Sequence, residues 1–396
     1  MGDFSKRIEP YPVKLALITN NVSIRKPFDS DSAINMKILI VFARFRGGTG
    51  RVVTHLARVL SANHDVAILG TKDAEQNFSC PENVQNIIFD CQKDSSESLI
   101  HYIWKRSKGI RKTILDFKPD VVVSFLSLIS TLVCISLFTT RVPIIVSERS
   151  NPLQEHHGWK FNLLRFIAYH RADLIVVQNR LFASFYKSYF KKKTVAIPNP
   201  VPTRTRKKDV HTVISAPRII ALGNLSPWKK YDRMINLFSK FHESYNDAVL
   251  TIYGDGVDRN RLNGLIKQLK LDGHVFLPGH ISDIDKIFSD ADIFWMTSER
   301  EGFPNALCEA MSAGLPCVMF ECHAGLREII QNGVNGFLIP YDDDNEFVKT
   351  TERLCRYKSL RNGIEESATE ISERYKEDIV VKMWEKTICD LVEESE

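Results

Sequence analysis

Residues 292–320 constrain the fold more than any other part of the chain. The run 292–296 is short and apolar, as is typical of a strand buried in a parallel sheet, and residues 316–320 predict a second such strand. Between them, Pro304 fits the first position of a helix, where a missing N–H costs nothing, and Gly314 fits the position after the last turn. The stretch therefore predicts a strand–loop–helix–strand unit of an α/β protein.

Two glutamates of this unit suit a nucleotide diphosphate sugar. Glu301 lies in the predicted loop, and Glu309 lies about one turn into the predicted helix. A helix start presents unpaired N–H groups and the positive end of the helix dipole, which favour a phosphate. Glu309 could then accept hydrogen bonds from ribose hydroxyls, and Glu301 from a second sugar. In the alternative interpretation the spacing is a coincidence, and Glu309 only complements the helix dipole.

The whole stretch resembles the signature of a known enzyme family. The retaining glycosyltransferases of the GT-B fold, group 1 or GT4, carry E-x7-E within EGFPN-x-L-x-E-A-M-x-x-G-x-P-x-V, and Glu301 and Glu309 hold both glutamate positions. The resemblance implies an α/β fold of two Rossmann-like domains facing across a cleft. It also implies that catalytic Glu301 contacts the donor sugar and that Glu309 binds the ribose. Further donor-binding positions in the same stretch are Gly302, Phe303, Pro304, Asn305 and Leu307.

A second donor segment, residues 223–232, resembles the family pattern G-R-L-x-x-x-K-G-x-D. Lys229 takes the position of the lysine that contacts the donor diphosphate, where a cation supports the charge developing on the leaving group. Asn224 stands in place of the family's Arg and cannot reproduce a bidentate phosphate clamp, although we still count it among the donor-binding residues. Lys230, in place of the family's Gly, or Arg300 could compensate.

The resemblance extends from Met36 to Pro340 and is densest after residue 218. Residues 275–284 resemble the family segment V-x-F-x-G-x-x-x-D-I, which packs near the nucleotide base through backbone groups. That match adds Ile281 to the implied donor-binding residues.

Two segments nearer the N-terminus are expected to face the acceptor and pyrophosphate. A Gly-rich turn, which includes Gly47, Gly48 and Thr49, resembles the family's GG-x-E-R loop, with Gly in place of its Glu. Glu148 and Arg149 follow a predicted strand, at the end where α/β proteins bind ligands. Their surroundings are similar to the S-E-R-N-x-P string of family members that act on lipid-linked oligosaccharides. A helix-capping turn is the alternative for this second segment.

The length of 396 residues suits two domains of ordinary size. We expect five parts: an extension of uncertain order at 1–35, an N-terminal acceptor-binding Rossmann-like domain at 36–200, a linker at 201–216, a C-terminal nucleotide-sugar-binding Rossmann-like domain at 217–372, and a C-terminal helix at 373–396 that crosses back to the first domain. Met36 is an alternative start of the native chain.

The charge is distributed unevenly. Residues 36–200 carry 23 Lys and Arg against 12 Asp and Glu, a net charge of +11, whereas residues 201–396 carry 25 against 32, a net charge of −7. A basic first half favours an anionic partner, and cations alternate with aromatic residues in 158–171 and 180–193. We therefore expect reversible binding to an anionic membrane surface, at the cytoplasmic face of the cytoplasmic membrane. A glycan or polyprenyl-diphosphate-linked acceptor fits this location, and nucleic acid is not expected.

Residues 121–140 contain no charged side chain, and their length alone would suit a membrane span. We instead predict a strand, a buried helix and a following strand, because an aspartate opens the stretch, serines interrupt it, and a second strand begins directly after it. The eight cysteines form no C-x-x-C pair, which predicts free thiols in a reducing compartment. No N-terminal signal peptide is recognised.

The function predicted from these residues is transfer of a hexose or N-acetylhexosamine from a nucleotide sugar, UDP-linked by preference, to an acceptor hydroxyl in glycan or surface polysaccharide synthesis. No cofactor and no metal are expected, because the resemblance implies that Lys229 and a helix dipole act in place of a divalent cation. Two alternatives stay open: a nucleotide-sugar 2-epimerase of the same fold, and a non-catalytic nucleotide-sugar-binding subunit, which Asn224 favours.

Overall fold

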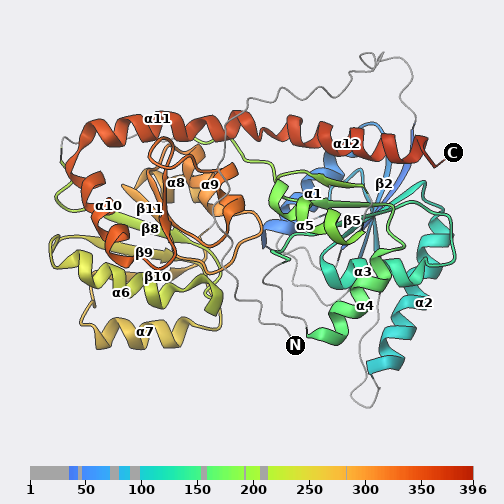
Figure 1. The fold of residues 1–396 in the computed structure, drawn as a ribbon, viewed down its shortest axis with the longest axis horizontal. Coiled ribbons are helices and arrows are strands. Elements are labelled where there is room, and N and C mark those ends of the chain that lie inside the picture. The colour runs from blue at the N-terminus through green and yellow to red at the C-terminus, as the bar shows by residue number, and fades with distance from the viewer. Residues whose placement is uncertain are drawn as a thin grey trace. The chain divides into compact units, whose positions relative to one another are not determined.

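The computed structural model describes residues 35–42, 47–71, 80–89, 99–152, 158–190, 193–205, 213–281 and 283–395. Residues 35–396 form one compact unit that contains two parallel sheets (Figure 1). The predicted extension lies outside the described residues up to residue 34. We use "N-terminal half" for residues 35–200 and "C-terminal half" for residues 213–376.

The first sheet has seven parallel strands in the order β3-β2-β1-β4-β5-β6-β7. Strands β4, β5 and β6 are buried at every position, as expected for strands covered on both faces. From β1 the chain adds strands first on one side (β2 and β3) and then on the other (β4 to β7). Ligands of open α/β sheets bind beyond the C-terminal strand ends at such a switch point. The strands are β1 (Lys37–Val41), β2 (Asp65–Thr71), β3 (Gln85–Phe89), β4 (Val121–Phe125), β5 (Ile144–Ser147), β6 (Leu174–Val177) and β7 (Thr194–Ala196).

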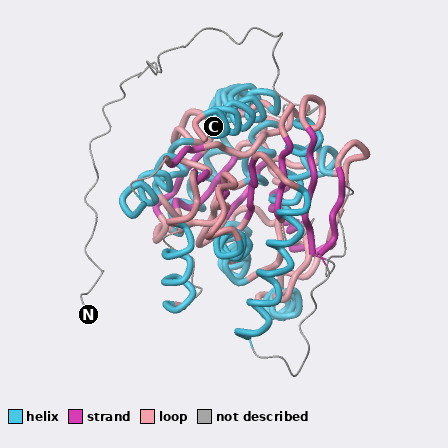
Figure 2. Tube along the Cα trace, turned by 90° about the vertical axis from the view of Figure 1, so that its right-hand side faces the viewer, coloured by secondary structure: helices cyan, strands magenta, loops and turns pink. Residues whose placement is uncertain are grey.

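Helices cover both faces of the first sheet (Figures 1 and 2). One face packs against α1 (Gly47–Leu60) and α12 (Glu377–Glu393). From α12, Trp384 is 1% exposed, and its ring centroid lies 5.8 Å from that of Phe125. The last helix of the chain is thus part of the core of the N-terminal half. The other face packs against α2 (Leu99–Phe117), α3 (Ser127–Ser136), α4 (Trp159–Tyr169) and α5 (Arg180–Phe190).

The second sheet has six parallel strands in the order β10-β9-β8-β11-β12-β13. Its strands are β8 (Arg218–Leu222), β9 (Val249–Tyr253), β10 (Val275–Gly279), β11 (Ile293–Met296), β12 (Cys317–Glu321) and β13 (Phe337–Pro340). One face packs against α6 (Tyr231–His242), α7 (Arg259–Gln268) and α10 (Asp344–Arg356). The opposite face packs against α8 (Ile284–Ser289), α9 (Asn305–Ser312) and α11 (Lys358–Arg374). Two short 3-10 helices, η1 (Pro227–Lys229) and η2 (Ala324–Glu328), follow β8 and β12.

The uncharged stretch 121–140 forms β4 and the buried helix α3, with β5 close behind, which confirms the predicted strand–helix–strand unit. Among the residues described, the structure contains no helix that is both long and apolar enough to cross a membrane.

Two local predictions need correction. The predicted Gly-rich turn is not a loop over Gly47, Gly48 and Thr49, because α1 already begins at Gly47; its preceding residues 43–46 lie outside the described ranges. Pro304 is not the first helical residue but the N-cap of α9, where its carbonyl accepts the Cys308 N–H at 3.0 Å. Gly314, by contrast, has the left-handed φ of 71° that was expected at the end of this helix.

Candidate active site

The two predicted catalytic side chains contact each other. Lys229 ends η1, which follows β8, and Glu301 lies on the loop after the neighbouring strand β11. The Lys229 Nζ lies 2.8 Å from Glu301 Oε1, and the two side chains are only 17% and 10% exposed. Because an ammonium group has three N–H donors, Lys229 can hold Glu301 and still donate to a ligand. The C-terminal edge of the second sheet therefore carries a paired, sheltered cation and carboxylate.

Backbone contacts fix the position of Lys229. Its N–H donates to Ser226 O at 2.9 Å, and the Thr297 hydroxyl donates to the carbonyls of Lys229 and Lys230, each at 3.0 Å. A Cβ on Gly223 would lie 2.9 Å from the Tyr231 hydroxyl and 3.5 Å from Lys229 Cε. Glycine at this position therefore leaves the space through which the lysine side chain extends.

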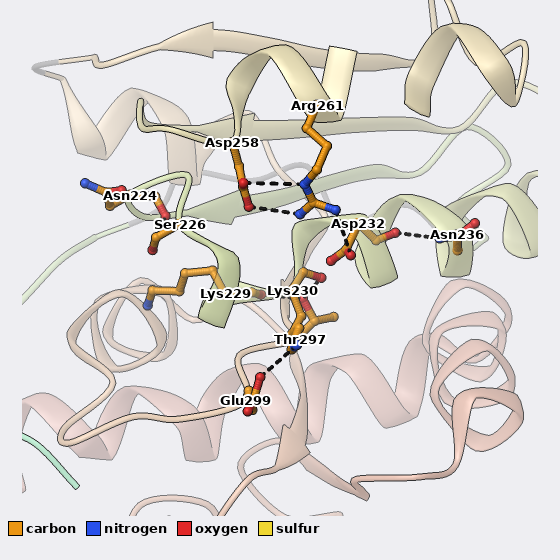
Figure 3. Close-up of polar contacts among 10 residues, drawn as sticks. All are labelled: Asn224, Ser226, Lys229, Lys230, Asp232, Asn236, Asp258, Arg261, Thr297 and Glu299. Atoms are coloured by element: carbon orange, nitrogen blue, oxygen red, sulfur yellow. Dashed lines mark hydrogen bonds and ion pairs between the residues drawn. The ribbon is translucent and has the colours of Figure 1, made fainter. Parts of the chain in front are cut away.

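The structure explains why the family pattern has Gly where this chain has Lys230. This residue has the left-handed conformation, with φ of 52° and ψ of 41°, which glycine adopts most easily. Its ammonium group lies 2.8 Å from Glu299, and Figure 3 shows it directed away from the Lys229 ammonium. The hydrogen bond that Lys230 donates to the Glu299 carboxylate raises the pKa of Lys230. Lys230 therefore does not take the place of the missing Arg at the donor site.

Asn224, which replaces the family's Arg, and Arg300, the other residue that could compensate for it, also lie on loops that follow β8 and β11. Asn224 is exposed, and its amide extends on the same side as the Lys229 side chain in Figure 3. A Cβ on Gly256 would lie 2.5 Å from Asn224 Oδ1, so glycine makes room for this amide. The Arg300 guanidinium lies over the Trp228 ring, 5.5 Å from its centroid.

Glu309 is held by two arginines that the sequence analysis did not connect with it. The carboxylate is buried, on α9, and its Oε1 lies 2.5 Å from Arg51 Nη1 of α1. Its Oε2 lies 3.4 Å from Arg204 Nη2, from the segment between the two sheets. The only sequence indication was that Arg51 belongs to the GG-x-E-R resemblance, since a contact across 258 positions leaves no local pattern.

The residues after Glu301 lie against the N-terminal half. A Cβ on Gly302 would lie 2.2 Å from the Arg149 carbonyl oxygen and 2.5 Å from Gln178 Oε1, so only glycine fits there. The Asn305 side chain accepts a hydrogen bond from Asn199 Nδ2 at 2.8 Å. These contacts join the loop after β11 and the start of α9 to the segments that follow β5, β6 and β7.

The other implied donor residues differ in their surroundings. Phe303 packs edge-on against Tyr375, with ring centroids 5.8 Å apart. The Leu307 side chain is wholly buried in the core, so a donor could meet only its backbone. Ile281 is 43% exposed, between β10 and α8. Of these three, only Ile281 presents its side chain to solvent.

The side chains of Glu148 and Arg149 are buried in the protein interior. Glu148 is 2% exposed and accepts hydrogen bonds from the hydroxyls of Tyr169 and Ser127, the latter at 3.2 Å. Arg149 donates to Asn199 Oδ1 at 2.9 Å, and its guanidinium lies over the rings of Phe125 and Trp384. Burial lowers the pKa of Arg149, and the neighbouring Glu148 carboxylate opposes that shift. The predicted acceptor role of these two residues stays a prediction.

His323, which lies where the two halves of the chain contact each other, was not predicted as a site residue. It follows β12, packs against Phe182 with the two rings tilted by 42° and their centroids 5.2 Å apart, and lines a small cavity together with Gln178, Asn179 and Gly302. Burial lowers the pKa of His323, so the imidazole is neutral at pH 7. The sequence indicated His323 only through its position directly after a predicted parallel strand, where α/β proteins bind ligands.

Within the described ranges, no group of three or more His, Cys, Asp or Glu side chains is arranged to hold a metal ion. The expected independence of metals and cofactors stays a prediction. The seven cysteines among the described residues are all free thiols.

Comparison with known proteins assigns both halves of the chain. A model described as "Glycosyltransferase Family 4" matches residues 46–205, and one described as "Glycosyl transferases group 1" matches residues 204–371. HepE from Anabaena, solved in complex with UDP and glucose, superimposes with a TM-score of 0.73 at 18% identity, over 90% of this chain and all of that one. The fold is therefore GT-B, an α/β architecture with two Rossmann-like sheets.

The amino-acid sequence is also similar to those of characterised glycosyltransferases over most of its length. An α-1,4-N-acetyl-D-galactosaminyltransferase of Campylobacter jejuni, named for an undecaprenol-diphosphate-linked acceptor, is 22% identical over 90% of this chain and 99% of its own. The amylovoran biosynthesis glycosyltransferase AmsD of Erwinia amylovora is 24% identical over 85% of this chain and 95% of its own. The chain belongs to the group 1, GT4-like glycosyltransferases, and it is a transferase enzyme.

Proposed function

We propose that this glycosyltransferase moves a hexose or N-acetylhexosamine from a UDP-sugar to a hydroxyl of a glycan or lipid-linked glycan, with retention at the anomeric carbon. The observation that carries the proposal is the sheltered Lys229–Glu301 pair, with Oε1 and Nζ 2.8 Å apart, at the C-terminal edge of the second sheet. A cation fixed at this edge can support the charge of a departing diphosphate, because it needs no reorganisation as the bond breaks.

Each residue then has one task. Lys229 donates to the donor diphosphate, while Glu301 accepts hydrogen bonds from hydroxyls of the donor sugar. Glu309 accepts hydrogen bonds from the ribose. The first turn of α9, with the positive end of its dipole, adds further stabilisation for the diphosphate, so that neither a metal nor a cofactor is required. The acceptor hydroxyl reaches the anomeric carbon from the side of the N-terminal half.

The names of related proteins support the choice of donor and acceptor. HepE was solved with UDP and glucose, and the Campylobacter relative acts on an undecaprenol-diphosphate-linked glycan. AmsD is named for polysaccharide synthesis. A UDP-sugar and a lipid-linked or growing glycan acceptor are thus consistent with all three.

A transfer assay tests this proposal. The protein is incubated with a panel of labelled UDP- and GDP-sugars and with polyprenyl-diphosphate-linked and free glycan acceptors, and proton NMR of the product gives its anomeric configuration. We expect transfer from at least one UDP-sugar with the configuration retained. Inversion would contradict retention. Release of a 2-epimerised sugar would favour the epimerase, and tight donor binding without turnover would favour a binding subunit.

We also propose that the N-terminal half binds an anionic membrane surface, where a lipid-linked acceptor would be held. Helix α4 exposes apolar side chains to solvent: Trp159 by 72%, Leu163 by 52% and Ile167 by 54%. The Lys160 ammonium lies 5.7 Å from the Trp159 ring centroid, so a cation accompanies the apolar face. This combination suits the headgroup zone of an anionic leaflet, with roughly 1 kcal/mol per cation near the surface.

Co-sedimentation with phosphatidylglycerol-containing vesicles tests the membrane proposal at low and high salt. We expect binding to anionic vesicles that weakens with salt, as the Debye length shortens. The double substitution Trp159→Ser and Ile167→Ser should reduce it. Val257→Ser is a matched control, because Val257 is 85% exposed in the C-terminal half. Equal binding to neutral phosphatidylcholine vesicles, or none at low salt, would contradict the proposal.

A further inference from the structure

The position at which the resembled family has a diphosphate-binding arginine holds an asparagine in this chain. Asn224 stands where the family pattern has Arg, and a neutral amide cannot replace a guanidinium that binds phosphate through two parallel hydrogen bonds. Lys230 pairs with Glu299, and Arg300 lies over Trp228. Lys229 would have to neutralise much of the diphosphate charge without a guanidinium beside it.

A guanidinium reaches this site from the N-terminal half. Arg51 lies in the second turn of α1, one turn beyond Gly47, and its Nη1 contacts the predicted ribose-binding carboxylate of Glu309 at 2.5 Å. The Arg51 side chain is still 46% exposed, whereas Glu309 is 7% exposed. Arg51 therefore contacts one buried carboxylate while much of its side chain stays exposed to solvent, unlike a side chain that is packed into the core.

Arg204, the second arginine on Glu309, is arranged differently. Its side chain is 13% exposed, its Nη1 lies 2.5 Å from Asp285 Oδ1, and its guanidinium lies over the Phe288 ring at 5.7 Å. Its backbone N–H donates to Ser312 Oγ at 3.1 Å. Arg204 is thus fixed to α8 and α9, and it can keep Glu309 oriented when Arg51 moves.

We propose that Arg51 is the donor-diphosphate arginine of this enzyme, supplied from the opposite half of the molecule in place of the residue missing at Asn224. The ribose hydroxyls and Arg51 compete for the same carboxylate, that of Glu309. When a nucleoside diphosphate binds, the ribose takes Glu309, and the guanidinium of Arg51 transfers to the phosphate oxygens beside it. The five N–H donors of the guanidinium allow it to contact both phosphates.

This inference rests on the proposed nucleotide-sugar donor, and it makes opposite predictions for two probes. Uridine has the ribose but no phosphate, so it only competes with Arg51 for Glu309. UDP has both groups. Arg51→Ala should therefore weaken UDP binding about tenfold to a hundredfold, which corresponds to the loss of charged hydrogen bonds, and should leave uridine binding unchanged or tighter.

Isothermal titration calorimetry with UDP and with uridine measures the difference. Arg218→Ala is the matched control, because this exposed arginine lies at the start of β8, at the opposite end of the strand from Asn224. The control should bind both probes as the wild type does. Adding Asn224→Arg to Arg51→Ala should restore most of the lost UDP affinity, since it returns a guanidinium from the donor's own side.

The outcomes separate the inference from the function on which it rests. Loss of UDP affinity alone, with recovery in the double variant, supports the inference. Unchanged or tighter UDP binding by Arg51→Ala overturns it, because Arg51 would then be only a competitor for Glu309. An equal loss for uridine and UDP also overturns it, because Arg51 would then act only by placing Glu309. A wild-type protein that binds neither probe overturns the proposed UDP donor itself.

Discussion

The two halves of this glycosyltransferase use similar sheets for different purposes. In the C-terminal half, the loops after β8 and β11 bring Lys229 and Glu301 into contact with each other at the strand ends. In the N-terminal half, the charged pair after β5 turns inward, where Glu148 is bonded to Tyr169 and Arg149 is enclosed by rings. The segment after a parallel strand can therefore carry a sheltered ion pair, as in the C-terminal half, or charged side chains that are bonded within the core, as in the N-terminal half.

This difference bears on the proposed function. The C-terminal half carries the groups that are proposed to bind the nucleotide sugar. The N-terminal half contributes Arg51 and the exposed face of α4, so the proposed acceptor contacts would depend on surface side chains rather than on one compact motif. Four experiments test this contrast between the two halves.

Lys229→Ala should have the largest effect, because it removes the cation that is proposed to support the leaving diphosphate. We expect kcat to fall about 100-fold to 1,000-fold, with a smaller change in KM. Steady-state kinetics with the active UDP-sugar measures this. Lys230→Ala is the neighbouring control, since its ammonium pairs with Glu299 and faces away, and it should change kcat by less than about threefold. A similar loss in both variants would refute the separate roles.

Glu309→Ala and Glu301→Ala should separate binding from turnover. Loss of the ribose contacts in Glu309→Ala should weaken uridine binding about tenfold. Glu301→Ala should depress kcat while UDP affinity stays within about threefold of the wild type, because this carboxylate is assigned to the sugar. Calorimetry and kinetics on both variants give the comparison. Equal losses of UDP affinity would show that the two glutamates do not have distinct roles.

Arg149→Ala should affect stability more than catalysis. The variant removes one of two donors to Asn199 Oδ1, the other being Gln178 Nε2 at 3.2 Å, and it removes a guanidinium packed between Phe125 and Trp384. We expect the free energy of unfolding to fall by about 2 kcal/mol in urea titrations. If stability is unchanged but the acceptor KM rises, Arg149 contacts the acceptor as the sequence predicts, and the contrast between the halves is weaker.

Removal of divalent ions should have the smallest effect. Lys229 and the α9 dipole are expected to neutralise the diphosphate without a metal. Transfer rates measured after treatment with EDTA should stay within about twofold of the untreated enzyme. A loss that Mg²⁺ or Mn²⁺ reverses would show that a metal takes part at the donor side.

The sequence predicted those parts that depend on short-range patterns. The β4–α3 unit followed from an uncharged stretch interrupted by serines, and the two motifs that the resemblance assigns to the donor, around Lys229 and Glu301, lie after adjacent strands. The start of α1 at Gly47 was missed, because glycine is a poor helix former and a Gly-rich run favours a turn. The contact of Arg51 with Glu309 could not be foreseen, because it joins residues 258 positions apart.

A crystal structure of the protein with UDP would locate the proposed donor site directly. We expect the ribose hydroxyls within hydrogen-bond distance of Glu309 and the diphosphate within reach of the Lys229 ammonium, with Glu301 beside the outer phosphate where the sugar begins. UDP bound away from these three side chains, or bound there without contact to Lys229, would contradict it.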